Sequence, residues 1–233
     1  KFNYINCSFR FNEIIGNNTK FMKKLPLYIS SSSEQNELKT LKRRYYTLSC
    51  NEMAITSALV NKLKIEPLKN VRVIEIISCS VQANAFKTLL SGLKNVEKIL
   101  IAGSTMVDFK KRNLVDLESL RTVVVMDSSL EFLDFIGKTK IREFKLHETM
   151  LDRKNDDVLA EFLMRTSSLE NLAVRVKQSH FYKCLLNDDS KEYTFRLKKL
   201  SITFENFGFG DDVDDHFLEI LKQHQDSLEH LEI

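Results

Sequence analysis

One six-residue pattern, apolar-x-x-apolar-x-apolar, recurs along most of the chain and constrains its fold more than any other feature. The second and third apolar positions are two residues apart, so they point to the same face of a β-strand. Successive copies begin 26, 25, 24, 21, 28, 28 and 31 residues apart. Self-similarity at such a period predicts a repeat architecture. The copies are Tyr45-Leu48-Cys50 (the weakest), Val71-Ile74-Ile76, Val96-Ile99-Ile101, Leu120-Val123-Val125, Ile141-Phe144-Leu146, Leu169-Leu172-Val174, Leu197-Leu200-Ile202 and Leu228-Leu231-Ile233.

The segments that follow these copies change to helical spacing. Apolar residues three and four apart follow the strand patterns, as expected for amphipathic helices. Ser128 with Glu131, and Asp211 with Asp214, suit helix N-termini. We therefore predict that each unit is a strand plus a helix and that the strands pair in parallel. The apolar helical positions are Phe86, Leu89, Leu90 and Leu93; Val158, Leu159, Phe162 and Leu163; and Phe217, Leu218 and Leu221. The predicted strands lie near residues 72–77, 97–102, 121–126, 142–147, 170–175 and 198–203.

The copies resemble the leucine-rich-repeat pattern LxxLxLxx(N/C), with long repeats of the ribonuclease-inhibitor-like type. In that family, a side chain at the ninth position secures the turn after the strand. Small polar residues hold this position in four copies, and two later copies depart from the pattern. The resemblance covers residues 45–233, about eight repeats. It implies an α/β solenoid shaped like a horseshoe, with parallel strands on the concave face and helices on the convex face. The four small polar residues are Cys79, Ser104, Ser128 and Thr149, and the two departures are Lys177 and Glu205.

Residues 1–44 lack the repeat and form an N-terminal capping segment. This segment also resembles the tail of an F-box, a resemblance carried either by Lys1-Phe2-Asn3 or by Arg10-Phe11-Asn12-Glu13. Proteins with an F-box before such repeats are substrate receptors of cullin-RING ubiquitin ligases, and their F-box binds the ligase adaptor. The alternative is a leucine-rich-repeat scaffold or inhibitor with no ligase. We expect the chain to be a fragment, because it starts without Met and stops inside the last repeat copy.

The outward positions of the strands are the candidate partner-binding surface. Three consecutive repeats place apolar residues there, next to cationic ones, and an exposed apolar patch rimmed by charge is typical of protein-binding sites. A register slip of one residue would exchange the two faces. Asp at Leu100 or Val124 is expected to weaken binding while changing stability by no more than about 1 kcal/mol. The candidate residues are Glu75, Ile77, Leu100, Ala102, Val124, Met126, Lys145, His147 and Arg175.

Charge is divided unevenly along the chain. Residues 1–112 carry a net charge of +11 and residues 113–233 carry −8, within a total of +3. The basic clusters at residues 42–44 and 110–112 are short and lack interleaved aromatic residues, so nucleic acid is not the expected partner. No apolar stretch is long enough to span a membrane.

Sequence motifs for catalysis and metal binding are absent. The chain has no P-loop, GxSxG or HExxH motif, so we expect neither an enzyme nor a cofactor. Its four cysteines are scattered without a CxxC pair, which predicts no zinc site and favours reduced thiols in an intracellular protein, cytoplasmic or nuclear. The acidic run at residues 211–215 fits the first turn of a helix better than a cation site.

Overall fold

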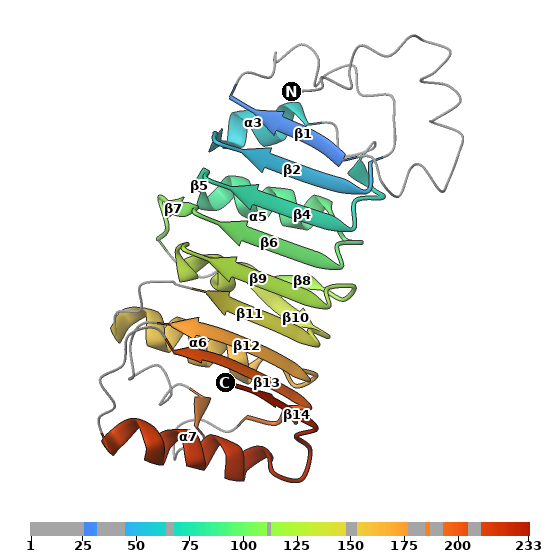
Figure 1. The fold of residues 1–233 in the computed structure, drawn as a ribbon. Helices are drawn as coiled ribbons and strands as arrows, with labels where there is room; N and C mark the ends of the chain where they lie inside the picture. Colours follow the sequence, from blue (N-terminus) through green and yellow to red (C-terminus); the bar gives the residue numbers. More distant parts are fainter. Residues whose placement is uncertain are drawn as a thin grey trace.

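A single parallel sheet organises the protein. The computed structural model describes residues 26–31, 45–63, 68–110, 113–147, 153–176, 185–186, 193–204 and 211–233. In these residues, nine strands form an α/β fold in which the order of strands in the sheet is their order in the chain (Figure 1). The strands are β1 (Pro26–Ser30), β2 (Thr47–Asn51), β4 (Val73–Ile77), β6 (Lys98–Ala102), β9 (Thr122–Met126), β11 (Glu143–His147), β12 (Asn171–Val176), β13 (Lys199–Phe204) and β14 (His230–Glu232).

The predicted strands and their parallel pairing are confirmed. Each of the six begins one residue later than predicted and ends at the predicted residue or one beyond it. All eight strand pairings are parallel and without register shift, so equivalent positions of neighbouring repeats lie side by side. Ile74, for example, pairs with Leu48 on one side and with Ile99 on the other.

The apolar positions of the repeat build the core. Ile74 and Ile76 on β4 are fully buried, and so is Val71, which precedes the strand. Each such side chain contributes about 1.5–3 kcal/mol when it leaves water. The last copy differs because β14 ends the sheet: Leu231 is 40% exposed and Ile233 is 70% exposed. One core therefore runs continuously behind the strands, shared between repeats.

Helices cover one face of this sheet. α3 (Ser57–Lys62), α5 (Ala83–Gly92) and α6 (Arg153–Met164) lie behind the strands in Figure 1, and α7 (Asp211–His224) connects β13 to β14. α5 buries Phe86, Leu89 and Leu90, which confirms the helical spacing predicted for this segment. α7 begins at Asp211, so the acidic run does fall in the first turn of a helix.

The prediction of one α-helix in every repeat is wrong in two places. Between β6 and β9, the described residues form two short strands, β7 (Thr105–Val107) and β8 (Val115–Leu117), and no helix. Between β9 and β11, only a 3₁₀ helix, η3 (Leu130–Phe135), is present, because the shortest repeat spacing leaves little room for an α-helix. β7 joins β3 (Ala54–Ile55) and β5 (Ser80–Gln82) in a parallel sheet, and β8 pairs with β10 (Ile136–Thr139).

β1 is a strand that the sequence pattern did not predict. It pairs with β2 in the same register as the repeats, with Leu27 beside Leu48 and Ile29 beside Cys50. Both apolar side chains are buried. The first apolar position of this copy is Lys24, which broke the pattern in the sequence. The sheet thus reaches into the predicted capping segment of residues 1–44.

The ninth position of the repeat carries a ladder of hydrogen bonds. The Ser104 hydroxyl donates to the Ala102 carbonyl at 2.9 Å and accepts from the Cys79 backbone N–H at 3.0 Å. Ser128 repeats the arrangement, donating to Met126 at 2.7 Å and accepting from the Ser104 N–H at 2.9 Å. Ser128 therefore belongs to the ladder and does not cap a helix as predicted. Thr149, the next ninth-position residue, lies outside the described residues.

The turn after each strand also repeats in its backbone. Glu52, Ser78, Gly103 and Asp127 directly follow β2, β4, β6 and β9, and all have positive φ, between 45° and 56°. Only glycine adopts this left-handed conformation without steric cost. The same strand-to-turn geometry thus occurs in four consecutive repeats.

Removing one rung of the ladder should be costly. We expect Ser104→Ala to lower the free energy of unfolding by about 1–2 kcal/mol, because the buried Cys79 N–H loses its acceptor. Urea denaturation of the parent and the variant measures this difference. Ser104→Cys is the matched control, since Cys79 holds the same position one repeat earlier and its thiol donates to the Ile77 carbonyl at 3.2 Å. Equal stability of the alanine variant and the parent would contradict a structural role for the ladder.

Among the described residues, no helix is both long and apolar enough to cross a membrane.

Candidate protein-binding face

The strict register of the sheet arranges its outward side chains in rows. Along each strand, residues alternate between the core and the opposite face, and neighbouring strands lie about 4.8 Å apart. The face opposite α3, α5 and α6 is not covered by any helix of the described residues (Figure 1). The start row holds Val73, Lys98, Thr122, Glu143, Asn171 and Lys199; the middle row holds Glu75, Leu100, Val124, Lys145, Ala173 and Ser201; and the end row holds Ile77, Ala102, Met126, His147, Arg175 and Thr203.

The nine predicted site residues fall in two of these rows. Glu75, Leu100, Val124 and Lys145 are consecutive in the middle row, and Ile77, Ala102, Met126, His147 and Arg175 are consecutive in the end row. The predicted facing is consistent with burial, because the flanking residues Val123 and Val125 belong to the core and Val124 does not. The structure therefore brings all nine together on one face.

The apolar part of this face is less exposed than the sequence suggested. Ile77, Leu100, Ala102 and Met126 are half-buried, and Val124 is only 7% exposed. The prediction of an exposed side chain is therefore wrong at Val124. The physical reason is its place in the row, where Leu100 and Lys145 flank it in register and cover a short side chain. Val124→Asp would bury a carboxylate, so this variant is expected to exceed the predicted limit of about 1 kcal/mol.

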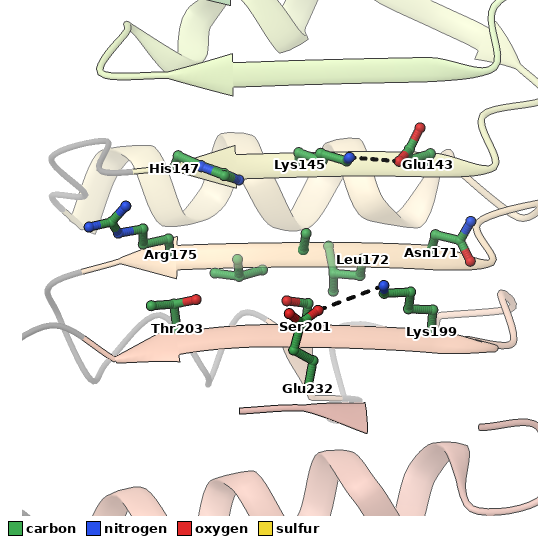
Figure 2. Close-up of a pocket in the computed structure, with 12 residues that line it drawn as sticks. Glu143, Lys145, His147, Asn171, Leu172, Arg175, Lys199, Ser201, Thr203 and Glu232 are labelled. Atoms are coloured by element: carbon green, nitrogen blue, oxygen red, sulfur yellow. Dashed lines mark ion pairs between the residues drawn. The ribbon is translucent and has the colours of Figure 1, made fainter. Parts of the chain in front are cut away.

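The polar part of the face contains two ion pairs. Lys145 Nζ lies 2.9 Å from Glu143 Oε1 on the same strand, and Lys199 Nζ lies 3.7 Å from Glu232 Oε2 on β14 (Figure 2). All four side chains are about one-third to three-fifths exposed, so solvent screens these pairs and each contributes at most about 1 kcal/mol to stability. The stability of the fold therefore depends little on these two ion pairs.

A depression of about 230 Å³ lies within this polar part. Figure 2 shows its lining residues on β11, β12 and β13, with His147 and Arg175 near one end of the strands and Lys199 and Asn171 near the other. Its floor is made by β12, where Ala173 has a short side chain between Lys145 and Ser201 in the middle row. The depression therefore offers both signs of charge and hydroxyl groups to a partner.

Sequence reasoning missed the start row and the edges of the sheet. Glu143, Asn171 and Lys199 line the depression, although none was singled out in the sequence. Their position in the repeat pattern, directly before the second apolar residue of each copy, could have identified them as outward-facing. Tyr28 on β1 was also missed and is 57% exposed in the middle row, next to Ser49.

The thiols that the structure describes are suited to packing. Cys50 and Cys79 are free and buried. Burial raises the pKa of Cys50 to about 12, with the neighbouring Cys79 adding to the effect, and burial also raises the pKa of Cys79. Thiols held protonated in this way are poor nucleophiles and poor metal ligands. Among the described residues, no three His, Cys, Asp or Glu side chains gather as a metal site would require.

Comparison with known proteins gives no family. The chain matches no protein-family model, and no curated protein matches it significantly. The function is therefore argued from the strand face.

Proposed function

We propose that the chain is a leucine-rich-repeat solenoid that binds a partner protein on the outward face of its strands. Three features support the repeat assignment: the chain-ordered parallel strands, the ladder at the ninth position and the recurring positive φ after the strands. In this proposal residues 45–233 are the repeat array, which curves into a horseshoe with the strands on its concave side. β1 extends that array toward the N-terminus.

One observation carries the binding function: the register aligns apolar and charged side chains as two adjacent zones on a face that no described helix covers. Leu100 and Met126 provide the apolar zone, and Lys145, His147 and Arg175 provide the polar zone. Interfaces combine a desolvated apolar centre with a polar rim in this way. The proposed activity is binding without catalysis, and it needs no cofactor.

Leu100 is the position at which this proposal is best tested. Leu100→Lys should weaken partner binding by at least about tenfold, because it places a charge in the desolvated centre of the interface. Lys is preferable to Asp, since Glu75 is the in-register neighbour of residue 100 and a second carboxylate there would destabilise the sheet. Crosslinking and affinity capture with the parent and the variant, followed by mass spectrometry, measures the loss.

Leu218→Lys on α7 is the matched control. Its side chain is 50% exposed and does not belong to the strand face. The control should retain every partner that the parent captures, and thermal unfolding should show both variants folded. Partners captured equally well by Leu100→Lys would place the binding site elsewhere.

The second part of the proposal is that the partner is a substrate of a cullin-RING ubiquitin ligase and that the protein is its F-box receptor. This part rests on the resemblance of Lys1-Phe2-Asn3 or Arg10-Phe11-Asn12-Glu13 to an F-box tail, and both segments lie outside the described residues. If an F-box precedes Lys1, the protein that contains it should co-purify with the ligase adaptor and cullin, and the 233-residue chain alone should not. The scaffold or inhibitor alternative predicts no adaptor in either case. An intracellular location belongs to this proposal.

A further inference from the structure

A column of charged side chains runs along the edge where the strands begin. Each member directly precedes its strand, and each backbone N–H donates to the carbonyl of the member before it, at 2.7–3.0 Å. Neighbouring members are therefore as close as neighbouring strands. The column reads Arg72, Glu97, Arg121, Arg142, Glu170, Lys198 and Glu229.

Charge alternates along this column except at one step. Arg72 pairs with Glu97 at 3.1 Å, and Lys198 pairs with Glu170 at 3.4 Å. Between these pairs Arg121 and Arg142 are direct neighbours, linked by a 2.8 Å backbone hydrogen bond. Two like charges at adjacent positions of a sheet repel. The fold keeps a repulsive arginine pair where alternation would have placed a carboxylate.

The same two arginines line a recess of about 480 Å³ at this edge. Lys140, Arg196 and Lys198 add three more cations to its lining, against the single carboxylate of Glu170. This recess lies outside the outward strand face, whose rows start one residue later. It holds more charge of one sign than the depression on the strand face, whose lining mixes both signs.

Internal partners account for little of this positive charge. Arg121 donates through Nη1 to the carbonyls of Glu118 at 2.7 Å and Leu120 at 2.9 Å, which fixes its guanidinium without neutralising it. Glu170 is engaged by Lys198. No described carboxylate forms an ion pair with Lys140, Arg142 or Arg196.

We propose that this recess binds a phosphate monoester, carried either by a phosphorylated side chain or by a small molecule. Guanidinium groups present a planar fork that matches phosphate oxygens, and clustered arginines are the usual device for recognising a phosphorylated residue. Ser167, Ser168 and Thr194 line the recess as further hydroxyl donors. A nucleic acid fits less well, because no aromatic residue lines the recess to stack on a base.

Fluorescence anisotropy with the 233-residue chain tests the site. The probes are a labelled degenerate phosphoserine peptide, its unphosphorylated twin and a labelled single-stranded RNA, with phenyl phosphate as the small competitor. The phosphopeptide should bind at least about tenfold more tightly than its twin, given the strength of charge-assisted hydrogen bonds. Phenyl phosphate should displace it at constant ionic strength. If phenyl phosphate protects the chain against thermal unfolding but no phosphopeptide binds, the source is a small molecule.

Arg142→Gln is the decisive variant, because Arg142 is exposed and its loss leaves the core intact. Binding of the phosphate probes should fall about tenfold, whereas Arg142→Lys should retain part of it. Arg72→Gln is the matched control: it occupies the same column position but is paired with Glu97, so it should bind like the parent. Thermal unfolding should show Arg142→Gln at least as stable as the parent, since it relieves the repulsion with Arg121. Phosphate probes that bind no better than sulfate at equal ionic strength, equal binding by Arg142→Gln, or RNA bound more tightly than any phosphate monoester would overturn the proposal.

Discussion

Replacing Phe86 with alanine is expected to lower the free energy of unfolding by about 3–5 kcal/mol, the usual cost of removing a large buried aromatic side chain. Phe86 lies on α5 and is fully buried. Its ring meets the rings of Phe132 and Phe135 edge to face, with centroids 5.2 Å and 5.5 Å apart. Such contacts add about 0.5–1.5 kcal/mol beyond the buried area.

The effect should be large because these rings bridge a gap in the helical layer. The repeat between β6 and β9 has no helix in its described residues, so α5 packs directly on η3 of the following repeat. Phe109, from the repeat without a helix, adds a further edge contact to Phe135 at 6.0 Å. A cavity at Phe86 would remove the ring contacts that join α5 to η3 across this repeat.

Urea denaturation followed by circular dichroism measures this loss. Leu218→Ala is a suitable comparison, because a half-exposed side chain on α7 should cost well under about 1 kcal/mol. Phe86→Leu should fall between the two. A loss below about 1 kcal/mol for Phe86→Ala would mean that the aromatic cluster does not hold the repeats together.

The strands were predictable because their signal is local and repeated. An apolar residue at every second position, seen at Ile74 and Ile76 and again in each later copy, determines both the strand and its buried face. The helices carry a weaker signal, which failed where the repeat was short. η3 has buried apolar residues, as a helix would, but the 21-residue spacing admits only a 3₁₀ turn.

Exposure within the predicted face was not predictable in the same way. The alternation of Val123, Val124 and Val125 tells which side of the sheet Val124 occupies. How much of it reaches solvent depends on the neighbouring strands, which contribute Leu100 and Lys145. These neighbours are 24 and 21 residues away in the sequence. The local pattern around Val124 therefore does not predict how far they shield it from solvent.

The charge of the recess depends even more strongly on residues that are distant in the sequence. The half of the chain from residue 113 onward has a net charge of −8, yet every lining residue of the recess comes from it. Arg121 and Arg196 are separated by 75 positions and meet only because parallel repeats stack in register. The net charge of this half of the chain therefore gives no indication of the basic recess that its residues form.

His224 gives the second large prediction, a loss of stability as pH falls. It ends α7 and is only 2% exposed, with its ring stacked on Phe195 at a centroid distance of 5.6 Å. Its Nε2 lies 3.2 Å from Gln223 Nε2, and its Nδ1 has no hydrogen-bond partner among the described residues. Burial, together with a smaller contribution from the nearby charge of Arg196, lowers the pKa of His224 from 6.5 to about 4. The folded protein therefore keeps this imidazole neutral.

The direction of the pH effect follows from the two proton affinities. The unfolded chain takes up a proton at His224 near pH 6.5, whereas the folded chain does so only near pH 4. The contribution of His224 to the free energy of unfolding is fully present above pH 6.5 and is lost as pH falls toward 4. The loss amounts to up to about 3 kcal/mol, at about 1.4 kcal/mol per pKa unit. Denaturation curves measured at intervals from pH 4 to 7 would show this slope.

His224→Phe keeps the ring stacked on Phe195 but cannot titrate, so subtracting its curve from that of the parent isolates the contribution of His224 from that of the carboxylates. Parallel curves for the parent and His224→Phe over that range would show that the imidazole is accessible to protons in the folded state, and that the end of α7 is not packed as described.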